Sequence, residues 1–189
     1  MLLYHFTPGL RFKDILASNV VRASDAVMHG SIQHNAAVSL TTDIDPLGHG
    51  LPNGEVLTQT QANKVKLGWK DQQGQLRALV ATKWRLDFDI PATDPTLKKA
   101  SQYHTKKDLL GLQIAALLPY AHEPSALEIA QTSAKIATGA ILSKSDTWWV
   151  YLGDLPLSLC VGAASELPNG QWHRGTLAEF QDKVLGASL

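Results

Sequence analysis

The chain has 189 residues, of which 44% are hydrophobic and 18% charged, and its 17 lysines and arginines balance 17 aspartates and glutamates. This composition excludes a disordered chain. The zero net charge excludes a protein that holds nucleic acid by bulk positive charge, although it leaves room for a local basic groove. The length fits one domain with a substantial core, so we expect a single domain over residues 1–189.

The chain contains one cysteine, Cys160, within an apolar run. A single thiol cannot form an internal disulfide, and no zinc-ligand spacing surrounds it, so we expect a buried strand cysteine and no bound metal. The residues after Met1 do not read as a signal peptide. No run approaches the roughly 18 apolar residues of a membrane helix. We therefore expect a cytoplasmic protein with no membrane partner.

The amino-terminal third predicts a strand, a helix and a second strand. The strand covers Leu2 to Phe6, and a helix follows with Thr7 as its N-cap and Pro8 as its first residue. Asn19 is placed to end this helix in a left-handed turn. Residues 36–41 then alternate in the manner of a strand.

The middle of the chain predicts a long strand after a turn-rich stretch. Lys64 to Trp69 and the turn after them indicate a hairpin partner for it. The strand itself runs from Leu79 to Ile90 with strict alternation. One face carries Val80, Thr82, Trp84, Leu86, Phe88 and Ile90, and the other carries Lys83, Arg85, Asp87 and Asp89. Such alternation predicts that the first face packs on the core and the second faces water.

Helices dominate the remainder, with a second β region between them. Their limits are marked by Pro119, by the capping box of Ser125 and Glu128 ending at Gly139, and by the capping box of Thr176 and Glu179. The strands are Thr147 to Leu152 and Leu157 to Ala163. Because helices and strands mix without a βαβ rhythm, we predict the α+β class. No glycine-rich phosphate loop is present.

Polar side chains on the first two strands could contact a ligand. His5 stands among apolar residues near the end of its strand, where it could hydrogen-bond a ribose hydroxyl or a phosphate; a core histidine bonded to a backbone carbonyl is the alternative. Ser39 and Thr41 alternate with apolar residues, so both hydroxyls are expected to face away from the core, and Thr42 follows them. They could position a sugar or phosphate, or simply be polar residues of a wet face.

Aromatic residues follow a carboxylate late in the chain. After Asp146, the side chains of Thr147, Trp149 and Tyr151 share one face of the expected strand. Flat aromatic surface of this kind stacks on bases and nicotinamide rings. Core packing of the tryptophans is the alternative interpretation.

The order of these features resembles the ADP-ribosyltransferase-like superfamily, which includes poly-ADP-ribose polymerases, tRNA 2′-phosphotransferases and DNA-targeting ADP-ribosyltransferases. The resemblance rests on Leu3 to Thr7, then Ile15 and Leu16, then Val38 to Thr42, over about forty residues. Thr147 to Val161 is similar to the penultimate strands of that fold over about fifteen residues. The resemblance implies an ADP-ribosyltransferase-like split β-sandwich with flanking helices and NAD as co-substrate in its cleft.

The resemblance also implies roles for individual residues. His5 would hydrogen-bond the adenosine-side ribose and Ser39 would lie near the nicotinamide. Where the superfamily usually has a glutamate that stabilises the oxocarbenium ion, this sequence has Asp146 and Thr147, so Asp146 is the expected carboxylate and Glu166 its alternative. The remaining expected binding residues are Thr7, Arg22, Thr41, Thr42, Trp149 and Tyr151.

The first expected function is therefore cleavage of NAD at the nicotinamide–ribose bond, with transfer of ADP-ribose to a protein or nucleic acid. A DNA glycosylase or NAD glycohydrolase with the same pocket is an alternative. The DNA glycosylase would need a rim of basic residues around the pocket. That rim would comprise Arg11, Lys13, Arg22, Lys83 and Arg85. A module that binds a nucleotide or a host protein without catalysis is a third reading, favoured by the missing glutamate. Toxin, phage-conflict and modification roles all stay open.

Overall fold

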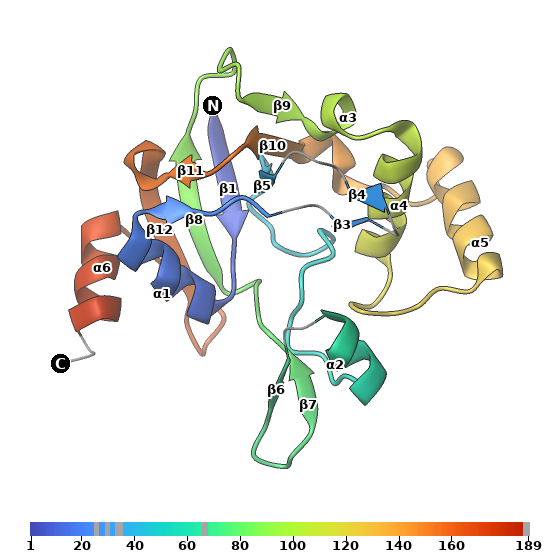
Figure 1. Ribbon diagram of the computed structural model, residues 1–189, viewed down its shortest axis with the longest axis horizontal. Coiled ribbons are helices and arrows are strands. Elements are labelled where there is room, and N and C mark those ends of the chain that lie inside the picture. The colour runs from blue at the N-terminus through green and yellow to red at the C-terminus, as the bar shows by residue number, and fades with distance from the viewer. Residues whose placement is uncertain (25–26, 29–30, 33–35, 66–67, 187–189) are drawn as a thin grey trace.

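The computed structural model describes residues 1–24, 27–28, 31–32, 36–65 and 68–186. Seven strands form its central sheet: β1 (Leu2–Phe6), β5 (Ala37–Thr41), β8 (Trp84–Asp89), β9 (Leu97–Lys99), β10 (Trp148–Leu152), β12 (Cys160–Glu166) and β13 (Trp172–Gly175). Their order is β13-β12-β8-β1-β5-β10-β9, and neighbouring strands are antiparallel (Figure 1). A large antiparallel sheet with separate helices confirms the α+β class.

Helices lie at both ends of this sheet. The described helices are α1 (Gly9–Ser18), α2 (Gln59–Val65), α3 (Ala100–Tyr103), α4 (Lys106–Leu117), α5 (Ala126–Ala137) and α6 (Leu177–Gly186), with short 3₁₀ turns η1 (Lys144–Thr147) and η2 (Leu157–Leu159), and α2 lies apart from the main sheet. Helices α1 and α6 lie side by side near β12, while α3, α4 and α5 lie toward β9 and β10 (Figure 1). Within the described residues, no helix is both long and apolar enough to cross a membrane.

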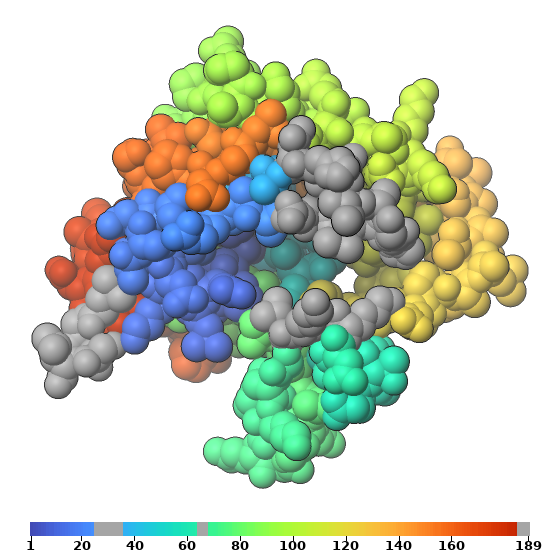
Figure 2. All heavy atoms as spheres, viewed as in Figure 1, coloured from blue at the N-terminus to red at the C-terminus, as the bar shows by residue number. Residues whose placement is uncertain are grey.

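Within the part of the chain that the structure describes, three short strand pairs stand outside the main sheet. They are β2 (Val20–Val21) with β11 (Leu155–Pro156), β3 (Val27–Met28) with β4 (Ser31–Ile32), and β6 (Gly68–Lys70) with β7 (Leu76–Ala78). The β6–β7 hairpin and α2 form a lobe that projects from the body of the molecule (Figure 2). The expected hairpin thus exists, but its partner is β7 and not the long strand, and Lys64 belongs to α2.

The main core lies between the sheet and the pair α1 and α6. Phe12 of α1 and Phe180 of α6 are 0% and 2% exposed and meet edge to face, with ring centroids 5.7 Å apart. They pack with Leu3 and Phe88 of the central strands, which are both fully buried. Burial of aromatic and branched side chains on this scale supplies most of the driving force for folding.

The sheet is nearly divided in two between β1 and β5. β1 pairs with β8 at five positions, and β5 pairs with β10 at five positions. β1 and β5 themselves meet only at Tyr4, opposite Thr41. The two halves therefore diverge on one side of this contact, where backbone pairing stops.

The capping signals of the sequence are mostly confirmed. The capping box of Ser125 and Glu128 opens α5, and Thr176 exchanges hydrogen bonds with Glu179 at the start of α6. Asn19 ends α1 in the left-handed conformation, with φ of 55°. The expected N-cap is wrong by one residue, because the extended residue before α1 is Pro8 and makes no side-chain cap bond.

The expected strand from Leu79 to Ile90 begins too early, and its expected solvent-facing side is wrong for Arg85, although Lys83 and Asp89 are exposed. β8 begins at Trp84, because residues 82–83 form a turn that is tied to the loop before α2 through Thr82 Oγ1 and Asn53 Oδ1, 2.5 Å apart. Arg85 is not a solvent-facing residue: it is 1% exposed and bonds the carboxylate of Asp87 at 2.6 and 2.9 Å. Alternation identifies two faces, but it does not reveal that a charge pair is buried on one of them.

Candidate functional site: the gap between the two halves of the sheet

A cavity of about 370 Å³ opens where β1 and β5 diverge. Its walls come from both strands, from the loop after β5, from α3 and α4, and from the start of β10. The volume falls within the roughly 300–1,000 Å³ of small-molecule sites, and the lining is mainly apolar and aromatic, as such sites usually are. Among the described residues that line it, none is an aspartate or glutamate.

His5 crosses the gap between the two strands. Its Nδ1 lies 3.0 Å from the carbonyl oxygen of Ser39, and both residues line the cavity. A carbonyl oxygen only accepts, so Nδ1 carries the proton and Nε2 keeps its lone pair. Burial lowers the pKa of His5, and the Ser39 bond opposes this only in part. The ring is therefore neutral at pH 7 and offers an acceptor at Nε2.

Several other expected residues meet His5 around this cavity. Ser39, Thr41, Trp149 and Arg22 all line it. Thr41 differs from expectation, because it is buried and its Oγ1 lies 2.9 Å from Oγ1 of Thr147 instead of facing water. Of the basic rim expected for a DNA enzyme, Arg22 alone lines the described cavity. The prediction that Arg85 belongs to this rim is wrong, because its side chain is buried and paired with Asp87.

Five expected site residues do not line the cavity: Thr7, Thr42, Asp146, Thr147 and Tyr151. Asp146 is exposed on η1, and its backbone oxygen accepts a 2.6 Å hydrogen bond from Nζ of Lys99. That ammonium also lies 4.7 Å above the ring of Trp149. Glu166, the alternative carboxylate, lines a different cavity and faces Lys83 at 3.9 Å.

The lining residues that sequence reasoning missed include three with ring nitrogens: His49, His104 and Trp148. The histidines appear scattered in the sequence, and the tryptophan alternates onto the opposite face from Trp149, so no local signal identifies them. In the described part of the chain, the buried side-chain nitrogens without a hydrogen-bond partner are His49 Nε2, His104 Nδ1 and Trp149 Nε1. All three belong to side chains that line this cavity. A polar group from a ligand or water would satisfy the nitrogens of His104 and Trp149, whereas His49 Nε2 faces the carboxylate of Asp43 at 3.8 Å.

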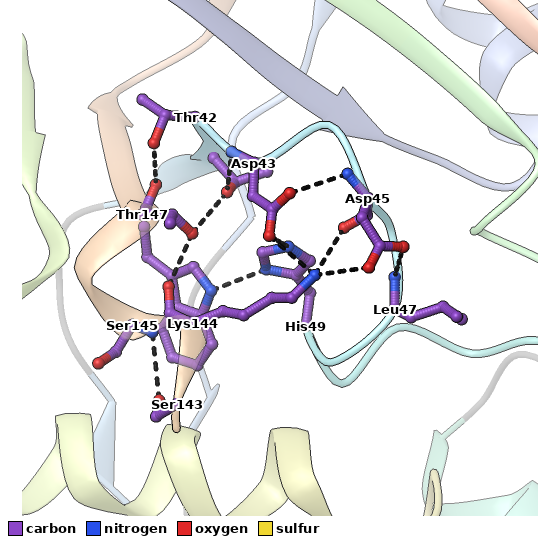
Figure 3. A network of polar contacts seen from close by, with 11 residues as sticks. Thr42, Asp43, Asp45, Leu47, His49, Ser143, Lys144, Ser145 and Thr147 are labelled. Atoms are coloured by element: carbon purple, nitrogen blue, oxygen red, sulfur yellow. Dashed lines mark hydrogen bonds and ion pairs between the residues drawn. The ribbon is translucent and has the colours of Figure 1, made fainter. Parts of the chain in front are cut away.

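An ion-pair network holds the loop that follows β5 (Figure 3). Lys144 on η1 contacts Asp43 and Asp45 at 2.8 and 2.9 Å. The hydrogen bond to Lys144 is the main reason that the pKa of Asp45 lies below its ordinary value. Burial alone would raise the pKa of Asp43, but its bonds to Lys144 and the Asp45 amide outweigh that effect and lower it. Both carboxylates are therefore ionised at pH 7.

Lys144→Met is expected to loosen this loop at neutral pH and to matter less in acid. The lowered pKa values mean that the carboxylates contribute stability above the ordinary aspartate pKa of about 3.9, and that this contribution is lost as pH falls through the lowered values. The pairs are partly exposed, so the loss in the free energy of unfolding should be about 1 kcal/mol at pH 7. Urea unfolding at pH 7 and pH 2.5 measures it, with the exposed Lys70→Met as control. An equal loss at both pH values would contradict the assignment.

Comparisons with known proteins identify no relative. No protein-family model matches the chain, and neither a search of curated proteins nor a search of solved structures finds a similar one. Among the residues described in the structure, no three histidine, cysteine, aspartate or glutamate side chains gather as metal ligands would.

Proposed function

We propose that the protein is an ADP-ribosyltransferase-like enzyme that binds NAD in this cavity, cleaves the nicotinamide–ribose bond and transfers ADP-ribose to a protein or nucleic acid. The observation that carries the proposal is the neutral His5 ring, fixed on the Ser39 carbonyl beside the gap between β1 and β5. In this proposal, the nearly divided sheet corresponds to the split β-sandwich of that superfamily. The gap between its halves is then the NAD cleft.

The lining offers complementary contacts to each part of a dinucleotide. Nε2 of His5 accepts a hydrogen bond from a ribose hydroxyl, since Nδ1 is committed to Ser39. The indoles of Trp148 and Trp149 offer faces on which a base or nicotinamide can stack. Arg22, the residue of the described lining that is charged at all pH values of interest, suits a pyrophosphate.

The protonation states favour NAD over a neutral nucleobase in DNA. Burial is the main cause that lowers the pKa of His5, His49 and His104, so these lining imidazoles are neutral at pH 7. A base leaving DNA needs a proton from an acid as its glycosidic bond breaks. Nicotinamide is already a cation in NAD; it takes the electron pair of the broken glycosidic bond and departs neutral, while the acceptor forms the new bond to the ribose carbon and releases its proton to water. NAD therefore needs no acid in the cavity.

A nucleotide-binding module without catalysis is the second candidate. It is favoured by the absence of a carboxylate from the described cavity lining and by the exposed position of Asp146 on η1. A carboxylate near the ribose is the usual stabiliser of the developing oxocarbenium charge. This candidate predicts binding of NAD and ADP-ribose without bond cleavage.

Incubation with NAD separates the two candidates. We expect nicotinamide, measured by chromatography, to appear in reactions that also contain DNA, RNA or cell lysate as acceptor, and more slowly with water alone. His122→Ala, which removes an exposed histidine paired with Glu128 outside the cavity, is the matched control and should leave the rate unchanged. Calorimetric binding of ADP-ribose without any nicotinamide release would favour the module. If the protein neither binds ADP-ribose nor releases nicotinamide from NAD, the proposed function is refuted.

A further inference from the structure

His49 lies between an indole and a carboxylate. Its Nδ1 accepts a 2.8 Å hydrogen bond from Nε1 of Trp148. Its Nε2 faces Oδ2 of Asp43 at 3.8 Å (Figure 3). The side chain is only 6% exposed. Phe6 of β1 closes the other side, with its ring stacked 6.4 Å from the imidazole. His49, Trp148 and Phe6 all line the cavity.

Both ring nitrogens of His49 are directed at the protein. An indole N–H only donates, so Nδ1 must be unprotonated and the single proton of the neutral ring sits on Nε2, toward Asp43. A ligand in the cavity would meet a ring whose nitrogens are both directed elsewhere. His49 therefore acts on a ligand through Trp148 and not by contact of its own nitrogens.

The charged side chains that face His49 are held by contacts at the end of β5. The backbone N–H of Asp43 donates to Oγ1 of Thr41 at 3.0 Å, and Lys144 bridges Asp43 and Asp45. These are the charged groups that face the imidazole, and their two negative charges exceed the single positive one. Gly50, at φ of 69°, brings the same loop so close to α4 that a Cβ there would lie 3.1 Å from Cα of Ala116. Contacts of this loop therefore fix the position of His49 Nδ1, the atom that accepts the hydrogen bond from Trp148.

We propose that His49 is a positioning residue that fixes the indole of Trp148 as the stacking wall of the cavity. The identity of the stacked ligand rests on the proposed function, whereas the His49–Trp148 contact does not. Orientation of an aromatic wall in advance reduces the ordering that a ligand must impose when it binds. Loss of the acceptor at Nδ1 should therefore weaken binding without removing any direct contact to the ligand.

Acid provides one way to remove that acceptor. Burial is the main cause that lowers the pKa of His49 below 6.5, Lys144 lowers it further, and Asp43 and Asp45 oppose both. The ring is neutral at pH 7, and protonation at lower pH turns Nδ1 into a donor that repels the indole N–H. Affinity for an aromatic ligand should accordingly fall as the pH drops through the lowered pKa.

Two substitutions at His49 separate its role as acceptor from its bulk. Asparagine places its amide oxygen on the same carbon that bears Nδ1, so His49→Asn keeps an acceptor for Trp148 but cannot titrate. His49→Phe keeps a ring and loses the acceptor. The readouts are the indole N–H resonance of Trp148 in ¹H–¹⁵N spectra, assigned with Trp148→Phe, and the Kd for NAD between pH 7.5 and pH 5.

We expect His49→Phe to shift the Trp148 resonance toward that of a free indole and to raise the Kd for NAD about tenfold, which corresponds to one hydrogen bond of about 1.4 kcal/mol. His49→Asn should keep the Trp148 resonance and the Kd for NAD near their wild-type values, and the resonance should no longer show an acid transition. An unchanged resonance in His49→Phe, or an acid transition retained in His49→Asn, would overturn the proposal. If wild type does not bind NAD, the proposed function fails, and the resonance with its acid transition still decides the role of His49.

Discussion

His5→Ala and His5→Asn are both expected to reduce nicotinamide release at least about 100-fold, the scale on which misplaced substrates lose rate. Both remove the Nε2 acceptor from the cavity. Asparagine can still donate from its amide to the Ser39 carbonyl, the contact that now spans 3.0 Å across the gap. His5→Asn should therefore preserve the junction of β1 and β5, whereas alanine should lose about 1 kcal/mol of stability with that bond.

The stability of the two variants distinguishes a ligand contact from a core histidine. Loss of about 1 kcal/mol in a chain of this size lowers the Tm by roughly 2–4 °C, so both variants should remain folded at assay temperature. Initial rates and thermal unfolding on the same samples provide the comparison. If His5→Asn retains near wild-type release, or if both variants unfold, the assignment of His5 to the ligand is wrong.

Asp87→Ala is expected to lower the free energy of unfolding by about 3–5 kcal/mol, because it leaves a buried guanidinium without its counter-charge. Arg85 is 1% exposed and lies between the rings of Tyr4 and Trp172, 4.7 and 5.3 Å from their centroids. Asp87 neutralises it through two hydrogen bonds. The corresponding drop in Tm is roughly 6–20 °C at about 2–4 °C for each kcal/mol. Urea unfolding at pH 7 measures the loss directly.

Two controls test whether buried charge is the cause. Asp14→Ala breaks an exposed pair with Arg11, 3.8 Å long, and should change stability by less than about 1 kcal/mol. The double variant Arg85→Met/Asp87→Leu removes both charges and should be far more stable than Asp87→Ala alone. A double variant as unstable as the single one would show that shape, and not charge, decides the effect.

Local rules in the sequence predict the ends of helices well. Asn19 and the pairs Ser125–Glu128 and Thr176–Glu179 act through hydrogen bonds within a few residues, so the sequence is sufficient to recognise them. The α+β class follows from the same local signals. The pairing of β1 with β8 and β5 joins segments more than thirty residues apart, and no local pattern determines it.

The candidate site is predictable only in part for the same reason. His5, Ser39 and Trp149 are expected on three separate strands, and they do line one cavity, but alternation within a strand does not reveal which strands are neighbours. His49 comes from a loop whose path depends on the Lys144 network, and His104 follows a one-turn helix, so neither has a periodic signal. The order of motifs predicts Asp146 as the site carboxylate, but η1 turns it to the surface.

A crystal structure of the protein with ADP-ribose tests the central claim most directly. We expect the ligand in the gap between β1 and β5, with a ribose hydroxyl within hydrogen-bond distance of His5 Nε2 and a ring against Trp148 or Trp149. A ligand bound elsewhere, or His5 closed off from it by aliphatic side chains, would contradict the assignment of this cavity as the nucleotide site.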